Sequence, residues 1–192
     1  MTGENKPASA KRAVTLSGSI RKGSYNQLLQ AYVGSRLAEA GVSVDAISLA
    51  DYPMPVFNED LEAEHTPQAA VELARLFREA DIIFWATPEY NGGVASLTKN
   101  TIDWVSRQKP SPWRHAIWGI GAVSSGKYSG VVGLAHLRDI LSKQGALIVP
   151  TLLGIGPAST AFDADGKPTE ENIRRKIEQI VLEMTHFSRG GI

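Results

Sequence analysis

The 192-residue sequence contains no cysteine, and this absence excludes several kinds of chemistry. Disulfide bonds, thiolate metal sites and a cysteine nucleophile are all ruled out, so redox chemistry would have to come from a bound cofactor. The sequence also lacks an excess of either charge, because 20 basic and 20 acidic residues give a formal net charge of zero. This balance argues against nucleic-acid binding and against membrane attachment by charge. The composition therefore favours a small-molecule partner.

An unbroken hydrophobic run is also missing. Residues 145–162 carry no charge, but Pro150, Gly154 and Gly156 interrupt them, so we expect a short buried strand at 146–150 followed by a loop. Residues 1–12 are polar and have no apolar segment typical of a signal peptide. We therefore expect a flexible tail at 1–12 and one cytoplasmic domain at 13–192.

Strand patterns and helix patterns alternate along the chain. Strand patterns occur at 13–17, 43–48, 81–87, 116–122 and 146–150, and helical periodicity fills 25–40, 67–80, 96–108, 129–144 and 170–187. In the last of these helices, apolar residues such as Ile173, Ile177 and Ile180 share one face, as in a helix packed on a sheet. Five successive βα units predict a parallel sheet with right-handed crossovers, covered by helices on both faces. The expected fold is a three-layer, doubly wound α/β domain.

The segment 87–93 (TPEYNGG) follows a strand pattern that is apolar on both faces, residues 81–86. In an open α/β sheet, ligands bind at the carboxyl ends of the strands, where the strand order reverses. We therefore expect residues 88–93 to contact a small molecule.

The first strand also ends in a distinctive loop, residues 17–26 (SGSIRKGSYN). Ser24 and Gln27 have the S-x-x-Q spacing of a capping box, so a helix should begin there. Free amides at a helix start, several hydroxyls and the guanidinium of Arg21 favour a phosphate group. The lysine of a Walker A loop is missing before Ser24, and no G-x-G-x-x-G follows the strand. The loop thus fits a phosphomonoester best, and a plain solvated βα turn is the alternative.

Other motifs are weaker. The segment 121–126 misses the G-x-S-x-G nucleophile elbow by one residue, and the four histidines have no metal-ligand spacing, so we expect no metal. The acidic run at 59–64 is expected to form a solvated loop. Four tryptophans are expected in the core or at subunit contacts: Trp85, Trp104, Trp113 and Trp118. Trp104 is the one to compare with the site, because it lies only one helix beyond the 87–93 segment.

Together, these segments resemble the NAD(P)H-dependent FMN reductases of flavodoxin-like fold, a family that includes bacterial quinone, chromate and azo reductases. The resemblance rests on the 17–26 loop, on residues 88–91 (PEYN) with 99–104 (KNTIDW), and on 124–126 (SSG) with 136–138 (HLR). Matched strands and helices extend it over 13–187. It implies a five-stranded parallel sheet of order 2-1-3-4-5.

The resemblance also implies a cofactor, a reaction and an assembly. FMN would accept hydride from NADH or NADPH and pass electrons to a quinone, chromate, azo compound or similar acceptor, in a homodimer or homotetramer. Alternatives are a reductase that releases reduced flavin, an electron-carrying flavodoxin and a flavin-free binding protein. No catalytic acid or base is implied. The FMN-binding residues carried over are Ser17, Ser19, Ile20, Arg21, Ser24, Tyr25, Asn26, Pro88, Glu89, Tyr90, Asn91, Gly92, Ser124, Ser125 and Gly126.

The sequence departs from the family after Asn91. Many relatives have an aromatic residue, a serine and then Pro-Gly there, whereas this chain has Gly92, Gly93, Ala95 and Ser96. Two glycines without a proline predict a roomier, more mobile loop and a changed preference among acceptors.

Overall fold

The computed structural model describes residues 10–126 and 128–188. Residues 1–9 of the expected tail lie outside the described residues. The first strand begins at Arg12, one residue earlier than the sequence pattern predicts, because the Arg12 amide donates a hydrogen bond of 2.8 Å to Asp81 Oδ2.

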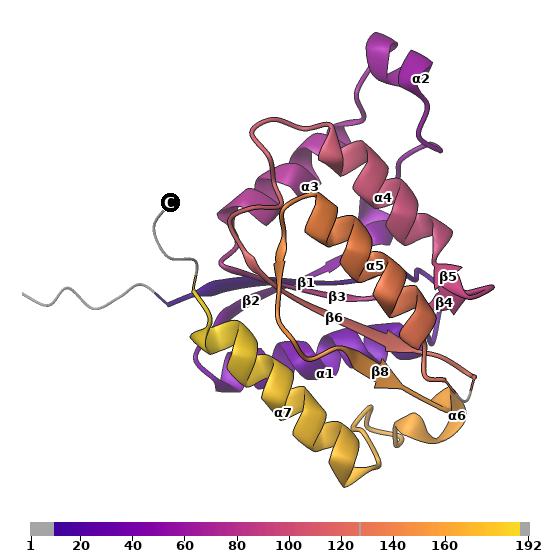
Figure 1. The fold of residues 1–192 in the computed structure, drawn as a ribbon, viewed down its shortest axis with the longest axis vertical. Helices are drawn as coiled ribbons and strands as arrows, with labels where there is room; N and C mark the ends of the chain where they lie inside the picture. Colours follow the sequence, from indigo (N-terminus) through magenta and orange to yellow (C-terminus); the bar gives the residue numbers. More distant parts are fainter. Residues whose placement is uncertain (1–9, 127, 189–192) are drawn as a thin grey trace, which may run out of the picture.

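A parallel sheet forms the centre of the molecule (Figure 1). Its strands are β1 (Arg12–Ser17), β2 (Ser43–Ser48), β3 (Ile82–Ala86), β6 (Ile117–Val123), β7 (Leu147–Ile148) and β8 (Leu153–Ile155). The order is β2-β1-β3-β6-β7, and β8 also pairs with β6 in parallel. The predicted order 2-1-3-4-5 is confirmed, except that two short strands share the fifth position.

The break in the fifth strand has a local cause. Val149 still donates its amide to Trp118 O at 2.9 Å, but Pro150 has no amide to continue the ladder. Thr151 instead donates its amide and hydroxyl to the carboxylate of Glu183, at 3.0 and 2.7 Å. Pairing resumes at Leu153, which lies opposite Gly121. The predicted strand at 146–150 is therefore shorter, and the predicted loop contains a second strand.

Helices cover both faces of the sheet, as predicted (Figure 1). One face packs against α1 (Tyr25–Glu39) and α7 (Glu171–His186), and the other against α3 (Gln68–Glu79), α4 (Ser96–Ser106) and α5 (Val131–Lys143). Alternation along each strand divides the core, as in β3, where Phe84 joins the α1/α7 side and Trp85 the opposite side. The shorter elements are η1 (Leu49–Asp51), α2 (Glu59–Glu64), β4 (Glu89–Tyr90), β5 (Gly93–Val94) and α6 (Ala158–Ala161).

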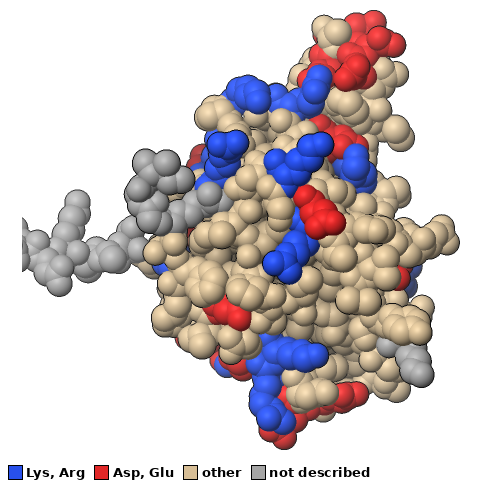
Figure 2. All heavy atoms as spheres, in the orientation of Figure 1, with Lys and Arg blue, Asp and Glu red and all other residues tan. Residues whose placement is uncertain are grey.

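The acidic run at 59–64 forms the helix α2, so the prediction of a loop was wrong. Asn58 begins the helix by accepting a hydrogen bond from the Asp60 amide at 2.8 Å, and acidic residues in a first turn interact favourably with the helix dipole. None of its residues is buried. Figure 2 shows its acidic side chains gathered at the top of the molecule.

All four tryptophans lie in the core, which was one of the two predicted locations, the other being subunit contacts. Trp85, Trp113 and Trp118 surround Phe77, with ring centroids 5.6 to 6.1 Å from it. Trp104 donates its indole N–H to Pro55 O at 2.8 Å and packs edge-on against Phe57. Trp104 therefore anchors the segment before α2.

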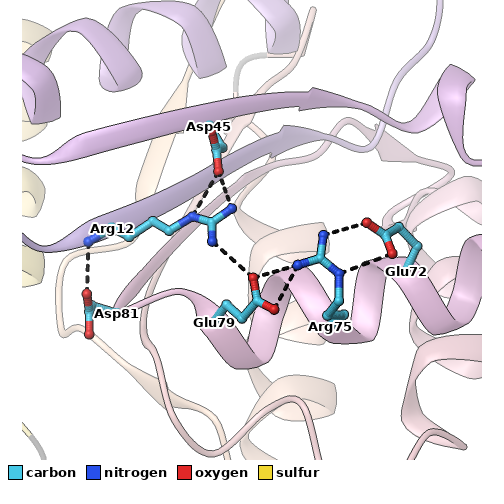
Figure 3. Close-up of polar contacts among 6 residues, drawn as sticks. All are labelled: Arg12, Asp45, Glu72, Arg75, Glu79 and Asp81. Carbon is cyan, nitrogen blue, oxygen red and sulfur yellow. Dashed lines mark hydrogen bonds and ion pairs between the residues drawn. The ribbon is translucent and has the colours of Figure 1, made fainter.

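A chain of exposed charges joins β1, β2 and α3 (Figure 3). The Arg12 guanidinium bonds Asp45 at 2.6 Å and Glu79 at 3.0 Å, and Glu79 also accepts from Arg75, which pairs with Glu72. The hydrogen bond from Arg75 lowers the pKa of Glu79. This network links the strand edge to the helix above it. Among the described residues, no helix is long and apolar enough to cross a membrane.

Candidate functional site

Three loops meet at the carboxyl ends of β1, β3 and β6. We call residues 17–24 the first loop, residues 87–95 the second loop and residues 124–126 with 128–130 the third loop. The first loop is attached to the end of β3 through Gly18, whose amide donates to Ala86 O at 2.7 Å. A Cβ on Gly18 would lie 2.0 Å from Thr98 Oγ1 and 2.8 Å from Thr87 Oγ1, and these two hydroxyls bond each other at 2.8 Å. The close approach of the loops therefore requires glycine at this position.

The helix α1 begins at Tyr25 with Ser24 as its N-cap residue, as predicted, but the capping box does not form. The Ser24 side chain makes no capping hydrogen bond, and Gln27 donates its side-chain amide to Ser19 O at 3.1 Å. The reason is that Gln27 serves to close the first loop. Ser24 is only 3% exposed and lines a cavity with its hydroxyl uncommitted to the helix.

Arg21 provides the positive charge that the first loop directs to the cavity. Its guanidinium donates to the carbonyls of Lys22 and Gly23, both at 3.1 Å, so the side chain curls along its own loop. It also lines the cavity and is the only basic residue among the described residues that do so. An anion in the cavity would meet this charge.

Asn26 makes structural hydrogen bonds that the sequence did not predict. Its side-chain amide donates to Val123 O at 3.0 Å and accepts from Val123 N at 2.9 Å, and both bonds are buried. The side chain thus mimics a strand partner for the last residue of β6. Asn26 lines the cavity, but its amide connects the first loop to the third.

The second loop forms a tight hairpin. Glu89 pairs with Val94 and Tyr90 with Gly93, and the two residues between them have positive φ angles, 52° at Asn91 and 70° at Gly92. A two-residue turn with both φ angles positive is a type I′ turn, which Asn-Gly strongly favours. The segment therefore has a defined turn, and the greater room and mobility expected of it stay a prediction. The positive φ angle at position 92 favours glycine. A Cβ on Gly93, in contrast, would make only ordinary van der Waals contacts, such as 3.7 Å to Tyr90 O.

Glu89 connects the second loop to the helix that follows the third. Its Oε2 accepts a hydrogen bond from the Gly133 amide, in the first turn of α5, at 2.8 Å. The side chain is therefore committed to α5, although Glu89 also lines the cavity.

The third loop is held mainly by backbone bonds. Ser124 donates its amide to Ile155 O and accepts at its carbonyl from the Ala158 amide, both at 3.0 Å. The Ser124 hydroxyl accepts from the Gly126 amide at 3.3 Å. These bonds bring α6, which sequence reasoning did not predict, to the edge of the site.

The cavity between the three loops has a volume of about 280 Å³. The predicted residues that line it are Ser19, Arg21, Ser24, Tyr25, Asn26, Pro88, Glu89, Tyr90, Ser124 and Ser125. Ser17, Ile20, Asn91, Gly92 and Gly126 were also predicted and are not among its lining residues. Ser17 lines a neighbouring cavity of about 250 Å³, and Ile20 is 53% exposed.

Val123 and Ala158 also line the cavity, and sequence reasoning missed both. The position of Val123 at the end of a central strand was a usable signal. Ala158 follows a segment with no recognisable motif, so its sequence gave no signal.

The lining combines serine hydroxyls, one guanidinium and an apolar wall formed by Pro88, Tyr90, Val123 and Ala158. Such a lining suits a ligand with an anionic end and a flat, partly apolar body. Among the described residues, no group of three or more histidine, aspartate or glutamate side chains could hold a metal ion.

Comparisons with known proteins agree on one family. The model of the NADPH-dependent FMN reductase family matches residues 12–160. An NAD(P)H-dependent FMN reductase of Pseudomonas aeruginosa is 34% identical over 171 residues, which cover 88% of this chain and 90% of the relative. A quinone reductase of Escherichia coli K12 is 37% identical over 147 residues, 74% of this chain and 77% of the relative.

Solved structures give the same picture. A flavoenzyme NAD(P)H:(acceptor) oxidoreductase of Paracoccus denitrificans superposes with a TM-score of 0.76 at 26% identity, covering 92% of this chain and 98% of that one. Its fold matches this chain over nearly the whole length of both.

Proposed function

The chain belongs to the NADPH-dependent FMN reductase family and is an FMN-dependent NAD(P)H oxidoreductase of flavodoxin-like fold, and we propose that the cavity between its three loops holds the FMN. The observation that carries this proposal is the lining of the cavity. One guanidinium and the buried hydroxyls of Ser19 and Ser24 lie beside the start of α1, where a phosphate is favoured. The residues present thus fit a phosphorylated flavin.

The chain's own residues divide the work of binding. Arg21, Ser19 and Ser24 would hold the phosphate through charge-assisted hydrogen bonds. Pro88 and Tyr90 on the second loop, with Ser124 on the third, would border the flavin ring. When bound, FMN supplies hydride acceptance from the nicotinamide and electron donation to the acceptor. The protein binds and orients both, and no side chain is assigned a proton-transfer role.

We propose a quinone as the acceptor class, because relatives in Escherichia coli and Arabidopsis thaliana are named quinone reductases. Chromate and azo compounds are further candidates within the same family resemblance. Steady-state rates with NADH and NADPH against a quinone, chromate, an azo dye and free FMN would rank the acceptors. Turnover that depends on added FMN would favour the alternative in which reduced flavin is released.

We propose that the chain forms a homodimer or homotetramer. Apolar side chains remain exposed in the third loop and in the first turn of α5, including Tyr128 at 77%, Val131 at 50% and Val132 at 42%. Contact with a second copy would cover them. Light scattering at micromolar concentration is expected to give a multiple of 20.7 kDa, and a mass of one chain would contradict the proposal.

Dependence on NAD(P)H supports a location in the cytoplasm, where that nucleotide is available.

The phosphate assignment is tested by binding. Arg21→Ala combined with Ser24→Ala should weaken FMN binding by about 100-fold, on the order of 3 kcal/mol, because charge-assisted bonds are lost. Fluorescence titration of the flavin-free chain gives both affinities. Lys22→Ala is the matched control, since Lys22 lies in the same loop but does not line the cavity. The wild type should bind riboflavin much more weakly than FMN, and equal affinities would refute the assignment.

A further inference from the structure

The helix α5 has no side-chain cap from its own segment. Its N-cap residue is Gly130, which has a φ of 74° and no side chain, and its first turn contains no acidic residue. The first amides of a helix need acceptors, and a negative charge is favourable there. Glu89, 44 residues earlier in the chain, provides such an acceptor to the Gly133 amide at 2.8 Å.

The hairpin and the helix are also in unusually close contact at this point. A Cβ on Gly133 would lie 3.1 Å from Gly93 O and 3.2 Å from both Cβ and Cγ of Glu89. Distances this short mean that a side chain at 133 would push the hairpin away from the helix by a few tenths of an ångström. Glycine at 133 therefore allows the Glu89 carboxylate to reach the helix amide.

This contact joins two walls of the cavity. Residues 88–90 form one wall and are continuous with the hairpin, whereas Ser124 and Ser125 form another, a few residues before α5. The type I′ turn leaves the hairpin little freedom of its own. Its position relative to the third loop is consequently set by its attachment to α5.

We propose that Glu89 is a positioning residue, whose carboxylate caps α5 and thereby fixes the distance between the second and third loops on either side of the flavin. This inference rests on the proposed FMN site. In this role Glu89 acts as a hydrogen-bond acceptor toward the helix and transfers no proton. Because the potential of a bound flavin depends on the groups held around its ring, loosening this attachment should alter both FMN affinity and the flavin midpoint potential.

The first test compares Glu89→Ala with Glu89→Gln in the full-length chain. Glu89→Ala removes the acceptor, so amide exchange in the first turn of α5 should accelerate about tenfold, as expected for a lost helix cap. FMN affinity should fall about tenfold, and the midpoint potential should shift. Glu89→Gln keeps an acceptor oxygen. Its amide exchange rate and FMN affinity should lie within about threefold of the wild type, and its midpoint potential should return close to the wild-type value. Asp139→Ala is the matched control, because Asp139 is an exposed carboxylate on the same helix.

A second variant approaches the contact from the helix. Gly133→Ala should favour the helix itself, since alanine is the better helix former. Its methyl group would nevertheless separate the helix from Glu89 and Gly93. We expect FMN affinity to fall about fivefold to tenfold with no loss of thermal stability, a combination that general destabilisation would not give.

The outcomes separate this inference from the FMN site itself. Unchanged amide exchange in Glu89→Ala would show that the cap is absent and would overturn the proposal. Faster exchange with unaltered FMN affinity and potential would overturn the link to the flavin. Failure of Glu89→Gln to restore the potential would mean that the charge of Glu89 acts directly, which also overturns positioning. If the wild type binds no FMN, the proposed function fails, whereas the exchange measurement still tests the cap.

Discussion

Two regions of the molecule are held together by different chemistry. At the carboxyl end of the sheet, the loops are joined by side chains bonded to backbone, as in the two buried bonds between Asn26 and Val123. Along the flank formed by β1, β2 and α3, the contacts are exposed ion pairs around Arg12, Arg75 and Glu79 (Figure 3).

The difference matters because water competes only for the second kind of contact. Exposed ion pairs exchange hydration for attraction at nearly equal free energy, and salt screens them. A buried donor or acceptor that loses its partner has no water to replace it and incurs the full desolvation penalty. The loops of the site should therefore depend on single residues, whereas the flank should tolerate change.

The largest expected effect is that of Asn26→Ala. It leaves both the amide and the carbonyl of Val123 without their buried partner, which should cost about 3 kcal/mol. For a chain of this size, that corresponds to a fall of about 9 °C in melting temperature. FMN affinity should fall as well, because the first and third loops lose their connection. Calorimetry and fluorescence titration measure the two effects.

Asn100→Ala is the matched control for this variant. Asn100 also bridges two backbone groups, accepting from Phe57 N at 2.8 Å and donating to Pro55 O at 2.9 Å, but it is partly exposed and away from the cavity. Water can replace its bonds, so we expect a loss of about 1 kcal/mol and unchanged FMN affinity. Equal losses in the two variants would remove the distinction between buried and exposed contacts.

An intermediate effect is expected at Glu183, a half-buried carboxylate bonded to Thr151. Burial alone would raise the pKa of Glu183, but hydrogen bonds from Gln179 and from the amide and hydroxyl of Thr151 outweigh it and lower the pKa. A lowered pKa in the folded state means that the ionised group stabilises the fold above its usual pKa. That contribution disappears as the pH falls through the lowered value.

Glu183→Ala should therefore cost about 1 kcal/mol near neutral pH, and its difference from the wild type should shrink in acid. Urea denaturation at a series of pH values would measure both quantities. Thr151→Val removes one of the donors and should lose about half as much. A difference between Glu183→Ala and wild type that is constant from pH 7 to about pH 3 would argue against an ionised Glu183 bonded to Thr151.

The smallest effect is expected on the flank. Arg75→Ala breaks the ion pairs with Glu72 and Glu79 in α3, but alanine at position 75 is a good helix former. We expect the melting temperature to stay within about 2 °C of the wild type. Any difference should vanish in about 1 M salt, where the Debye length is only about 3 Å. A loss comparable with that of Asn26→Ala would show that the exposed network is essential.

The regular part of the fold could be predicted from the sequence, because periodicity is a local signal. The five long helices begin and end within a few residues of the predicted bounds, as does each long strand. The α2 helix was missed because it buries nothing and so has no apolar face to detect. The β4–β5 hairpin was missed although Asn91-Gly92 is a favoured turn sequence, because its two strands have only two residues each and give no alternating pattern.

The roles of individual site residues were harder to predict. Asn26 and Glu89 were identified as residues of the site, and both line the cavity. Their hydrogen-bond partners, Val123 and Gly133, lie 97 and 44 residues away in the chain. No pattern in a single sequence indicates such pairs, so the bonds that hold the loops together could not be predicted, and contact of these two side chains with a ligand stays a prediction.

The separation between residues that hold the loops and residues whose side chains are exposed has a consequence for how this enzyme can diversify. Asn26, Glu89 and Gly18 are constrained by their partners, whereas Ile20 and Tyr90 are each 53% exposed at the same loops. Mutations at the exposed positions can be sampled without dismantling the loop framework. An evolving population, or a directed-evolution library, could therefore change the surface of these loops by varying Ile20 and Tyr90 while inheriting the framework intact.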